Sequence, residues 1–346
     1  MKQSINDQNK QDHVKNLFSL RQKLQLIVFF LTIAIGIQFS IFIYQTTQSP
    51  DPRVIRPPGI EAFLPIGGLT SWKLFFTTGN WDDIHPAAPV MLGFAVMLSL
   101  IMRKAFCGWF CPAGALSEWL WQLGKHIGLK IYKLPKIVDI PLRTLKYLLL
   151  GFFIWAILIK MSPPMIEGFL KSPYYMMADA KMLFFFLHPS LLTISVLAIL
   201  TILSLIIKQF WCRYLCPYGA LLGLFSIISP ARVERNVDLC IDCKMCSTKC
   251  FYNLPVSEKK RIIDAECVGC LECVRVCPER DALELKFFGL KLRRPTVKVC
   301  LITVVFFAVC WYTAQLTGHW HSKLTSADYH YLLRMIDNAV MKHPSF

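Results

Sequence analysis

Eight cysteines stand in two sets that share one spacing. Both sets follow the pattern C-x2-C-x2-C-x3-C, and Pro278 follows the last cysteine. In the bacterial form of this pattern, three thiolates of one run bind one [4Fe-4S] cluster and the fourth binds the other. The spacing therefore predicts two [4Fe-4S] clusters. Cluster 1 would be held by Cys240, Cys243, Cys246 and Cys277, and cluster 2 by Cys267, Cys270, Cys273 and Cys250.

Zinc is the alternative metal for such a set. Structural zinc sites favour separated C-x2-C pairs, often with histidine, and no histidine lies between these cysteines. The pattern therefore favours iron-sulfur clusters over zinc.

Four further cysteines occur in two copies of the frame aromatic-Cys-x3-Cys-Pro-x-Gly-Ala-Leu. The copies are FCGWFCPAGAL at 106–116 and WCRYLCPYGAL at 211–221. Proline suits the first position of a helix, so Cys111 and Cys216 are predicted N-cap residues. Free amide groups and the helix dipole would lower the pKa of a thiol placed there.

The likeness between the two regions extends upstream. His85-Pro86 and His188-Pro189 precede the first cysteine of the respective motif by 22 and 24 residues. We infer an internal repeat about an axis along the membrane normal, which would bring the four motif cysteines together. They could then bind a metal or a third cluster, or form a redox-active dithiol pair; the alternative is that they are inert helix caps. These cysteines are Cys107, Cys111, Cys212 and Cys216.

Apolar segments place these motifs at a membrane. The 346 residues are 55% hydrophobic and 17% charged. Five stretches are long enough to cross a bilayer, at about 24–44, 87–106, 145–162, 190–208 and 297–317. The predicted fold is an α-helical integral membrane protein of about five transmembrane helices with an inserted 2[4Fe-4S] ferredoxin-like α+β domain.

The net charge of +16 comes from basic residues beside the apolar runs, which indicates membrane orientation rather than binding of nucleic acid. The predicted organisation is a cytoplasmic segment 1–23, a four-helix membrane domain 24–232, a cytoplasmic ferredoxin-like domain 233–296, a fifth helix 297–317 and an outer tail 318–346. Twelve of the fourteen cysteines fall in the predicted inner segments 103–144 and 208–296, as expected for a reducing compartment. We expect a bacterial inner-membrane protein.

The stretch from about 20 to 318 resembles the NapH-type membrane ferredoxins, a family that includes the membrane half of the NosR regulator. The resemblance rests on the two CxxxCP motifs, the eight clustered cysteines and IEAFLPIGGL at 60–69. It implies a quinol dehydrogenase that transfers electrons between the quinone pool and a respiratory or accessory redox partner, such as a cytochrome or reductase.

Quinone chemistry also needs groups that exchange protons. The candidates, all expected near the outer surface, are Glu61, His85 and His188, with Asp82 and Asp83 beside them. A quinone site in the inner leaflet is the alternative, because it would spare electrons the crossing to the inner clusters. Its candidate residues are Trp109, Phe110 and Trp211.

Two other functions remain open at this stage. One is an assembly factor that uses iron-sulfur electrons to handle copper or another metal, and the other is a redox-sensing regulator. The stretch 119–137 suggests an interfacial helix or loop. A helix in the outer tail is expected to pack on its own loops, and His319, His321 and His330 are a weaker metal-site alternative.

Overall fold

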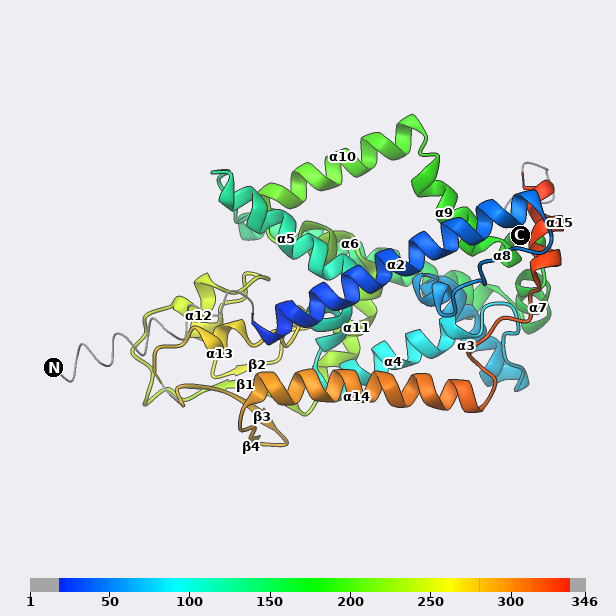
Figure 1. Cartoon of the computed structure of the whole chain (residues 1–346). Coiled ribbons are helices and arrows are strands. Elements are labelled where there is room, and N and C mark those ends of the chain that lie inside the picture. Colours follow the sequence, from blue (N-terminus) through cyan, green and yellow to red (C-terminus); the bar gives the residue numbers. More distant parts are fainter. Residues whose placement is uncertain (1–18, 280, 337–346) are drawn as a thin grey trace.

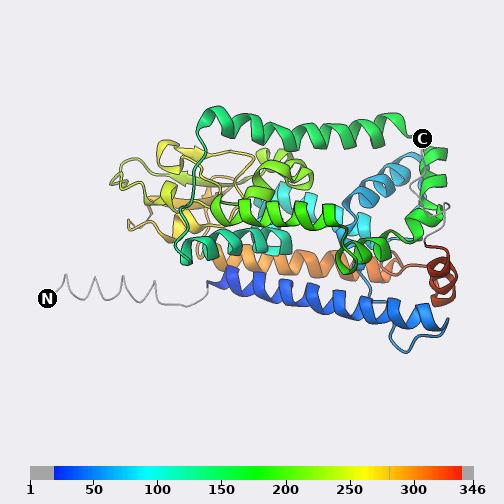
Figure 2. The same cartoon turned by 90° about the horizontal axis from the view of Figure 1, so that it is seen from above.

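The computed structural model describes residues 19–279 and 281–336, which are mostly helical. Long helices run side by side, and a small sheet lies at one end of them (Figures 1 and 2). Within the described residues, three helices are long and apolar enough to cross a membrane: α2 (Leu20–Gln48), α6 (Lys136–Ile154) continued by η3 (Trp155–Lys160), and α14 (Pro295–Leu316). Helices α9 (Ala178–Leu187) and α10 (Leu191–Ile206), bent by 77°, give a fourth if they form one span.

The expected second span is short in the structure. Helix α4 (Ala87–Met102) has 16 residues, which at 1.5 Å per residue gives about 24 Å, less than the hydrocarbon core of a typical bilayer. It ends there because Arg103 adopts φ 61°, a left-handed conformation that a helix cannot continue through. Five spans and the domain limits therefore stay predictions.

The two motif regions are related in three dimensions. The first runs from α4 through the π-helix η2 (Phe106–Phe110) into α5 (Pro112–His126), and the second from α10 through η4 (Trp211–Leu215) into α11 (Pro217–Ile227). Helix α4 packs on α11 while α10 packs on α5, the exchange that a two-fold repeat produces. Moreover, α2 packs on η2 and α5, and α6 packs on η4 and α11, so the repeat includes one more helix on each side.

The ferredoxin-like part contains a four-stranded antiparallel sheet of order β2-β1-β3-β4. Its strands are β1 (Ala231–Arg235), β2 (Arg261–Ile262), β3 (Leu283–Phe287) and β4 (Leu290–Lys291), and two short helices, α12 (Met245–Thr248) and α13 (Glu272–Arg275), lie in the cysteine loops. Val233 stands opposite Ile262 and Leu285, and all three are buried. One face of the sheet thus covers the cysteine loops with apolar side chains.

The cysteine loop after β2 contacts the first motif directly. A Cβ atom on Gly108 would lie 2.6 Å from the carbonyl oxygen of Val268, so this position has no room for a side chain. Trp109 Nε1 donates a hydrogen bond to the Gly269 carbonyl (3.0 Å), and the Arg103 guanidinium donates to the Asp264 carbonyl. These contacts fix the ferredoxin-like part on the membrane part.

Loop helices cover the opposite end of the bundle. They include α3 (Pro65–Thr78), α7 (Pro163–Leu170), α8 (Pro173–Met176) and α15 (Ser326–Arg334), with the 3-10 turn η1 (Ile60–Phe63) before α3 (Figure 1). Helix α15 buries Tyr329, Leu332 and Leu333 in an apolar cluster that also holds Phe39 and Phe42 of α2. The predicted tail helix thus packs on its own chain, and its part beyond 336 lies outside the described residues, as do 1–18 and 280.

The crossing of α5 and α10 offers a test of the repeat geometry. A Cβ on Gly124 would lie 2.0 Å from the Leu205 carbonyl oxygen, whereas a Cβ on Gly151 of α6 would meet no atom within 4 Å. We expect Gly124→Ala to lower the stability by about 1–3 kcal/mol, the usual cost of overpacking, and Gly151→Ala to have no such effect. Thermal unfolding in detergent measures both. Equal unfolding midpoints for the two variants would contradict the described crossing.

Candidate redox centres

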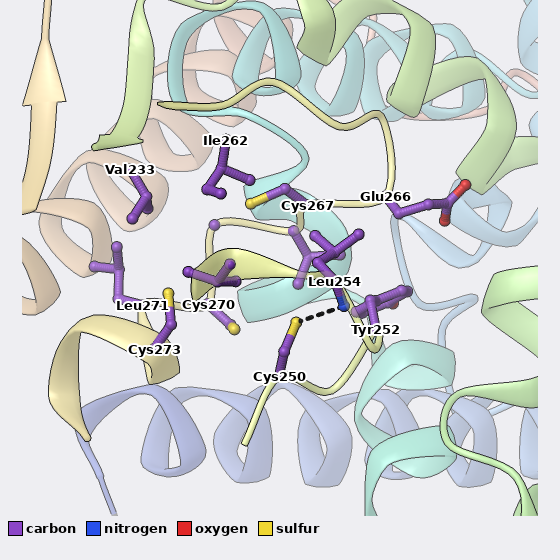
Figure 3. Close-up of a pocket in the computed structure, with 13 residues that line it drawn as sticks. Val233, Cys250, Tyr252, Leu254, Ile262, Glu266, Cys267, Cys270, Leu271 and Cys273 are labelled. Atoms are coloured by element: carbon purple, nitrogen blue, oxygen red, sulfur yellow. Dashed lines mark hydrogen bonds between the residues drawn. The ribbon is translucent and has the colours of Figure 1, made fainter. Parts of the chain in front are cut away.

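The four cysteines expected around cluster 2 line one cavity of about 420 Å³ (Figure 3). Most of its remaining walls are apolar, from Val233 and Ile262 of the sheet and from Leu254 and Leu271 of the loops. Tyr252 and the carboxylate residue Glu266 also line it. The Leu254 amide donates to Cys250 Sγ at 3.4 Å. The loop between β2 and β3 thus supplies three sulfur atoms and the preceding loop supplies the fourth.

A second cavity, of about 370 Å³, is lined by the four cysteines expected around cluster 1. It reaches the protein surface at Cys243, which is exposed together with its neighbour Ile241. Arg235 Nη1 lies 3.4 Å from Cys240 Sγ and so can donate a hydrogen bond to it. These cavity walls reproduce the ligand exchange between the two loops that the spacing predicts.

The chemistry of these two donor sets suits clusters. Each cavity brings together four sulfur atoms, the soft ligands that iron-sulfur clusters take. Among residues 19–279 and 281–336, no three His, Cys, Asp or Glu side chains are placed to share one metal ion. Thiolates around a cubane bind four different iron atoms, so they surround a volume instead of meeting at one point. The sets therefore fit [4Fe-4S] clusters better than a zinc ion.

The structure also gathers the motif cysteines. Cys111 and Cys216 occupy the N-cap positions of α5 and α11, and the Gly219 amide donates to Cys216 Sγ at 3.2 Å. Cys212 interacts electrostatically with the other three cysteines of the set. We call this set the four-thiol site. It consists of Cys107, Cys111, Cys212 and Cys216.

The expected lowering of the thiol pKa at the start of α5 is wrong. Burial raises the pKa of Cys111 to about 11, although the Gly114 and Ala113 amides act to lower it, and burial also raises the pKa of Cys107 and Cys212. Desolvation opposes the thiolate more strongly than the helix start favours it. A metal bound at such sulfur atoms replaces the proton, so the thiols fit a metal group better than free redox thiolates.

Buried charge next to the four-thiol site is a feature that the sequence analysis did not identify. Lys104 Nζ lies 3.9 Å from Glu266 Oε2, and the Lys146 ammonium pairs with the other oxygen of Glu266. All three residues are buried. The sequence holds a signal for it, because an ionisable residue beside or inside an apolar helix often marks function. Arg103 and Lys104 have this position, but the sequence analysis attributed basic residues beside apolar runs to membrane orientation.

Tyr252 lies between the four-thiol site and cluster 2. It lines the cluster 2 cavity (Figure 3) and interacts electrostatically with Cys107 and Cys212. Lys104 Nζ lies 5.9 Å from the centre of the same ring. The cavity expected to hold cluster 2 therefore lies next to the membrane part, whereas the cavity expected to hold cluster 1 has an exposed cysteine, Cys243.

Two of the proton-exchange candidates meet at the opposite end. Arg56 Nη2 lies 2.5 Å from Glu61 Oε1 and 2.8 Å from Asp179 Oδ2. His85 Nδ1 lies 3.8 Å from Glu61 Oε1. Burial acts to raise the pKa of Glu61, but the Arg56 guanidinium and His85 outweigh it and lower this pKa to about 2. Burial acts to lower the pKa of His85, but the nearby carboxylates of Glu61 and Asp179 outweigh it and raise this pKa.

The other predicted candidates lie apart from this network. His188 is exposed at the end of α9, and Asp83 is exposed and pairs with Lys323 (2.8 Å). Asp82 is buried and accepts hydrogen bonds from Ser71 and Tyr175. At the inner end Trp109 is fully buried, whereas Phe110 and Trp211 are partly exposed. In the tail, His319, His321 and His330 bond to separate partners: the Thr317 carbonyl, Gln315 and the Thr46 carbonyl.

Comparisons with known proteins agree with these sites. The model of a family described as "4Fe-4S binding domain" matches twice, at 84–130 and 187–235, and each match contains one CxxxCP motif. A family described as "4Fe-4S dicluster domain" matches 232–278, which contains all eight clustered cysteines. No solved structure matches the chain.

Several curated proteins are similar over much of the chain. The "Putative electron transport protein YccM" of Escherichia coli is 39% identical over 92% of this chain and 91% of its own. The "Ferredoxin-type protein NapH" of Escherichia coli is 25% identical over 64% of this chain and 80% of its own. The "Regulatory protein NosR" of Pseudomonas aeruginosa is 28% identical over 61% of this chain but only 28% of its own.

These matches define a class, the membrane-bound iron-sulfur proteins of electron transport. Within that class, the chain belongs to the NapH/NosR-type membrane ferredoxin family. The resemblance drawn from the cysteine motifs is thereby confirmed, as is the expectation of 4Fe-4S binding with membrane helices.

Substitution of single cysteines tests the ligand sets. Cys250 and Cys246 lie on the same loop but line different cavities. We therefore expect Cys250→Ser to impair cluster 2 and Cys246→Ser to impair cluster 1, each with a loss of about half of the iron bound by the eight cysteines. Iron analysis and EPR of anaerobically purified protein measure this. The sets would be misassigned if both variants lost the same EPR signal.

The Glu61 ion pair predicts a dependence of stability on pH. The pKa of Glu61 is about 2 in the folded protein and about 4.3 for an ordinary glutamate. A lowered folded pKa stabilises the fold above the unfolded pKa, and this contribution is lost as the pH falls towards 2. Relative to Glu61→Gln, the wild type should be more stable from pH 7 to about 4.3 and lose this advantage below it. Unfolding temperatures measure the gap, with the exposed Asp83→Asn as control; a gap that persists unchanged at pH 3 would contradict the ion pair.

Proposed function

We propose that this protein passes single electrons between the quinone pool and a redox partner protein through three centres in series. The observation that carries the proposal is the position of cluster 2, whose loop contacts the first motif through Gly108 and Val268. The order would be cluster 1, cluster 2 and the four-thiol site. When bound, [4Fe-4S] clusters supply carriers that each accept or release one electron.

The four-thiol site is proposed as the third [4Fe-4S] site. Its support is a repeated family match described as 4Fe-4S binding, together with four sulfur atoms brought from both repeats. The π-helices η2 and η4 position these sulfur atoms. Each contains the first cysteine of its motif and is followed directly by the second, which is the N-cap of the next helix. The surrounding residues exclude water, as Cys107, Cys212 and Trp109 are buried.

Cluster 1 is the proposed contact point for the partner. Cys243 is exposed, and the side chains of Val237, Leu239 and Ile241 beside it are 51%, 46% and 60% exposed. Exposed apolar side chains on a water-facing loop are typical of a protein interface. A redox protein docked there would approach the cysteine loop closely while the rest of the domain stays fixed to the membrane part.

The quinone site is proposed at the inner end of the membrane part, beside the partly exposed Phe110 and Trp211. Oxidation of a quinol releases two electrons and two protons, so the electrons must leave one at a time through the nearest centre. Phe110 and Trp211 belong to the motif segments themselves. The network of Glu61 and His85 is separated from the four-thiol site by α4, about 24 Å long. Its role is proposed as an ion pair that ties α15, α9 and η1 together.

Reduction by a quinol tests this function. Protein purified without oxygen and placed in lipid nanodiscs should show EPR signals of reduced clusters after addition of a menaquinol or ubiquinol analogue. A Cys107→Ser/Cys212→Ser variant should keep both ferredoxin-type clusters, reducible by dithionite, yet lose reduction by quinol. Cys300→Ser, in α14 outside the three sites, is the matched control.

Three outcomes would contradict the proposal. Protein that stays oxidised with quinol while its clusters are intact would exclude the quinone pool as donor. Stoichiometric copper bound through the four-thiol site would instead support the assembly factor. Unchanged quinol reduction in the double variant would remove the four-thiol site from the electron path.

A further inference from the structure

The described residues next to the four-thiol site bury more positive than negative charge. Five cations face three carboxylates in this region. Two of the cations have a carboxylate of their own, in the pairs Arg21–Glu118 (2.6 Å) and Arg213–Asp139 (2.9 Å). The others are Arg103, which donates to carbonyl oxygens, and Lys104 and Lys146, which share the single carboxylate of Glu266.

Lys104 is the least satisfied of these cations. It is 1% exposed, and its Nζ has no hydrogen-bond acceptor within the described residues. Glu266 is 3.9 Å away and its other oxygen already binds Lys146. Burial of an ammonium group without full pairing is costly. An anion that the protein's own side chains do not supply would remove this cost.

The ammonium group of Lys104 also lies near sulfur atoms of both motifs. Its ammonium group lies within electrostatic range of Cys107 and Cys216. A Cβ built on Gly219, three residues after Cys216, would lie 3.6 Å from Nζ. The missing anion therefore belongs at the four-thiol site, where four thiolates around an iron-sulfur cluster carry net negative charge.

We propose that Lys104 is the counter-charge of an anionic cluster held by the four-thiol site and that it raises the reduction potential of this cluster. The inference rests on the proposed third cluster. Reduction adds one electron, taken from the quinol or from cluster 2, and so adds one negative charge close to a buried cation. Lys104 thus stabilises the reduced form more than the oxidised form. Lys104 acts on the cluster through its charge alone, without a bond to it.

The repeat supplies a natural substitution. Lys104 stands three residues before Cys107, and the residue three before Cys212 is Gln209, which is also buried. Lys104→Gln therefore places the same neutral residue at both related positions. Lys104→Met removes the charge and keeps an unbranched side chain of similar length, and Lys104→Arg keeps the charge. The exposed Lys244→Gln, beside Cys243, is the control for a general effect of net charge.

The experiment is a potentiometric EPR titration of the anaerobic holoprotein. The relevant signal is the one absent from Cys107→Ser. In Lys104→Gln and Lys104→Met, the ratio of reduced to oxidised centre at a fixed potential should fall at least tenfold, equal to 59 mV for a one-electron couple. Lys104→Arg and Lys244→Gln should leave this centre near its wild-type potential. Glu266→Gln should move it in the opposite direction.

A third centre whose potential is the same in wild type, Lys104→Gln and Lys104→Met would overturn the inference, because Lys104 would then only support the fold. The presence of signals from clusters 1 and 2 shows that each variant is folded. Wild-type protein with no third centre would overturn the proposed third site itself, and the counter-charge with it. These two failures are distinguishable, since the second appears before any substitution.

Discussion

The absence of a side chain at Gly108 is the constraint on which the arrangement of redox sites depends. The gap between the Gly108 backbone and the Val268 carbonyl oxygen is too small for a methyl group. This close approach seats the cluster 2 loop against the first CxxxCP motif, and the Trp109 and Arg103 hydrogen bonds hold it there. Two segments about 160 residues apart in sequence thereby form the contact between the ferredoxin-like part and the membrane part.

Much of this arrangement follows from sequence alone. Cysteine spacing identifies both ferredoxin-type sets, because three ligands from one tight loop leave few geometric choices. The CxxxCP frame identifies the N-cap positions of Cys111 and Cys216, since proline is confined to the first turn of a helix. The duplicated frame also identifies the repeat. Its third helix on each side was missed, because α2 and α6 share packing partners but no sequence motif.

Other features depend on tertiary contacts that spacing does not encode. His85 and His188 look equivalent in sequence, yet only His85 is buried, because α8 and η1 cover it and nothing corresponding covers the end of α9 among the described residues. The pKa of the Cys111 thiol is raised, not lowered as expected, for a related reason. Its burial depends on contacts within the folded chain, which the position of Cys111 at a helix start does not reveal. In the sequence, Lys104 resembles the basic residues that orient a protein in the membrane. Its pairing with Glu266 could not be predicted, because Glu266 is 162 residues away in the chain.

The burial of charge at the end of α4 has a consequence for how the centres respond to their surroundings. Helix α4 ends at Met102, and the two residues that follow it, Arg103 and Lys104, are each 1% exposed. Mobile ions screen exposed charges within about 10 Å at 0.1 M salt but reach buried ones poorly. Changes in cellular ionic strength will therefore alter the electrostatics around the exposed Cys243 loop, while the sulfur atoms at depth keep a nearly constant local field.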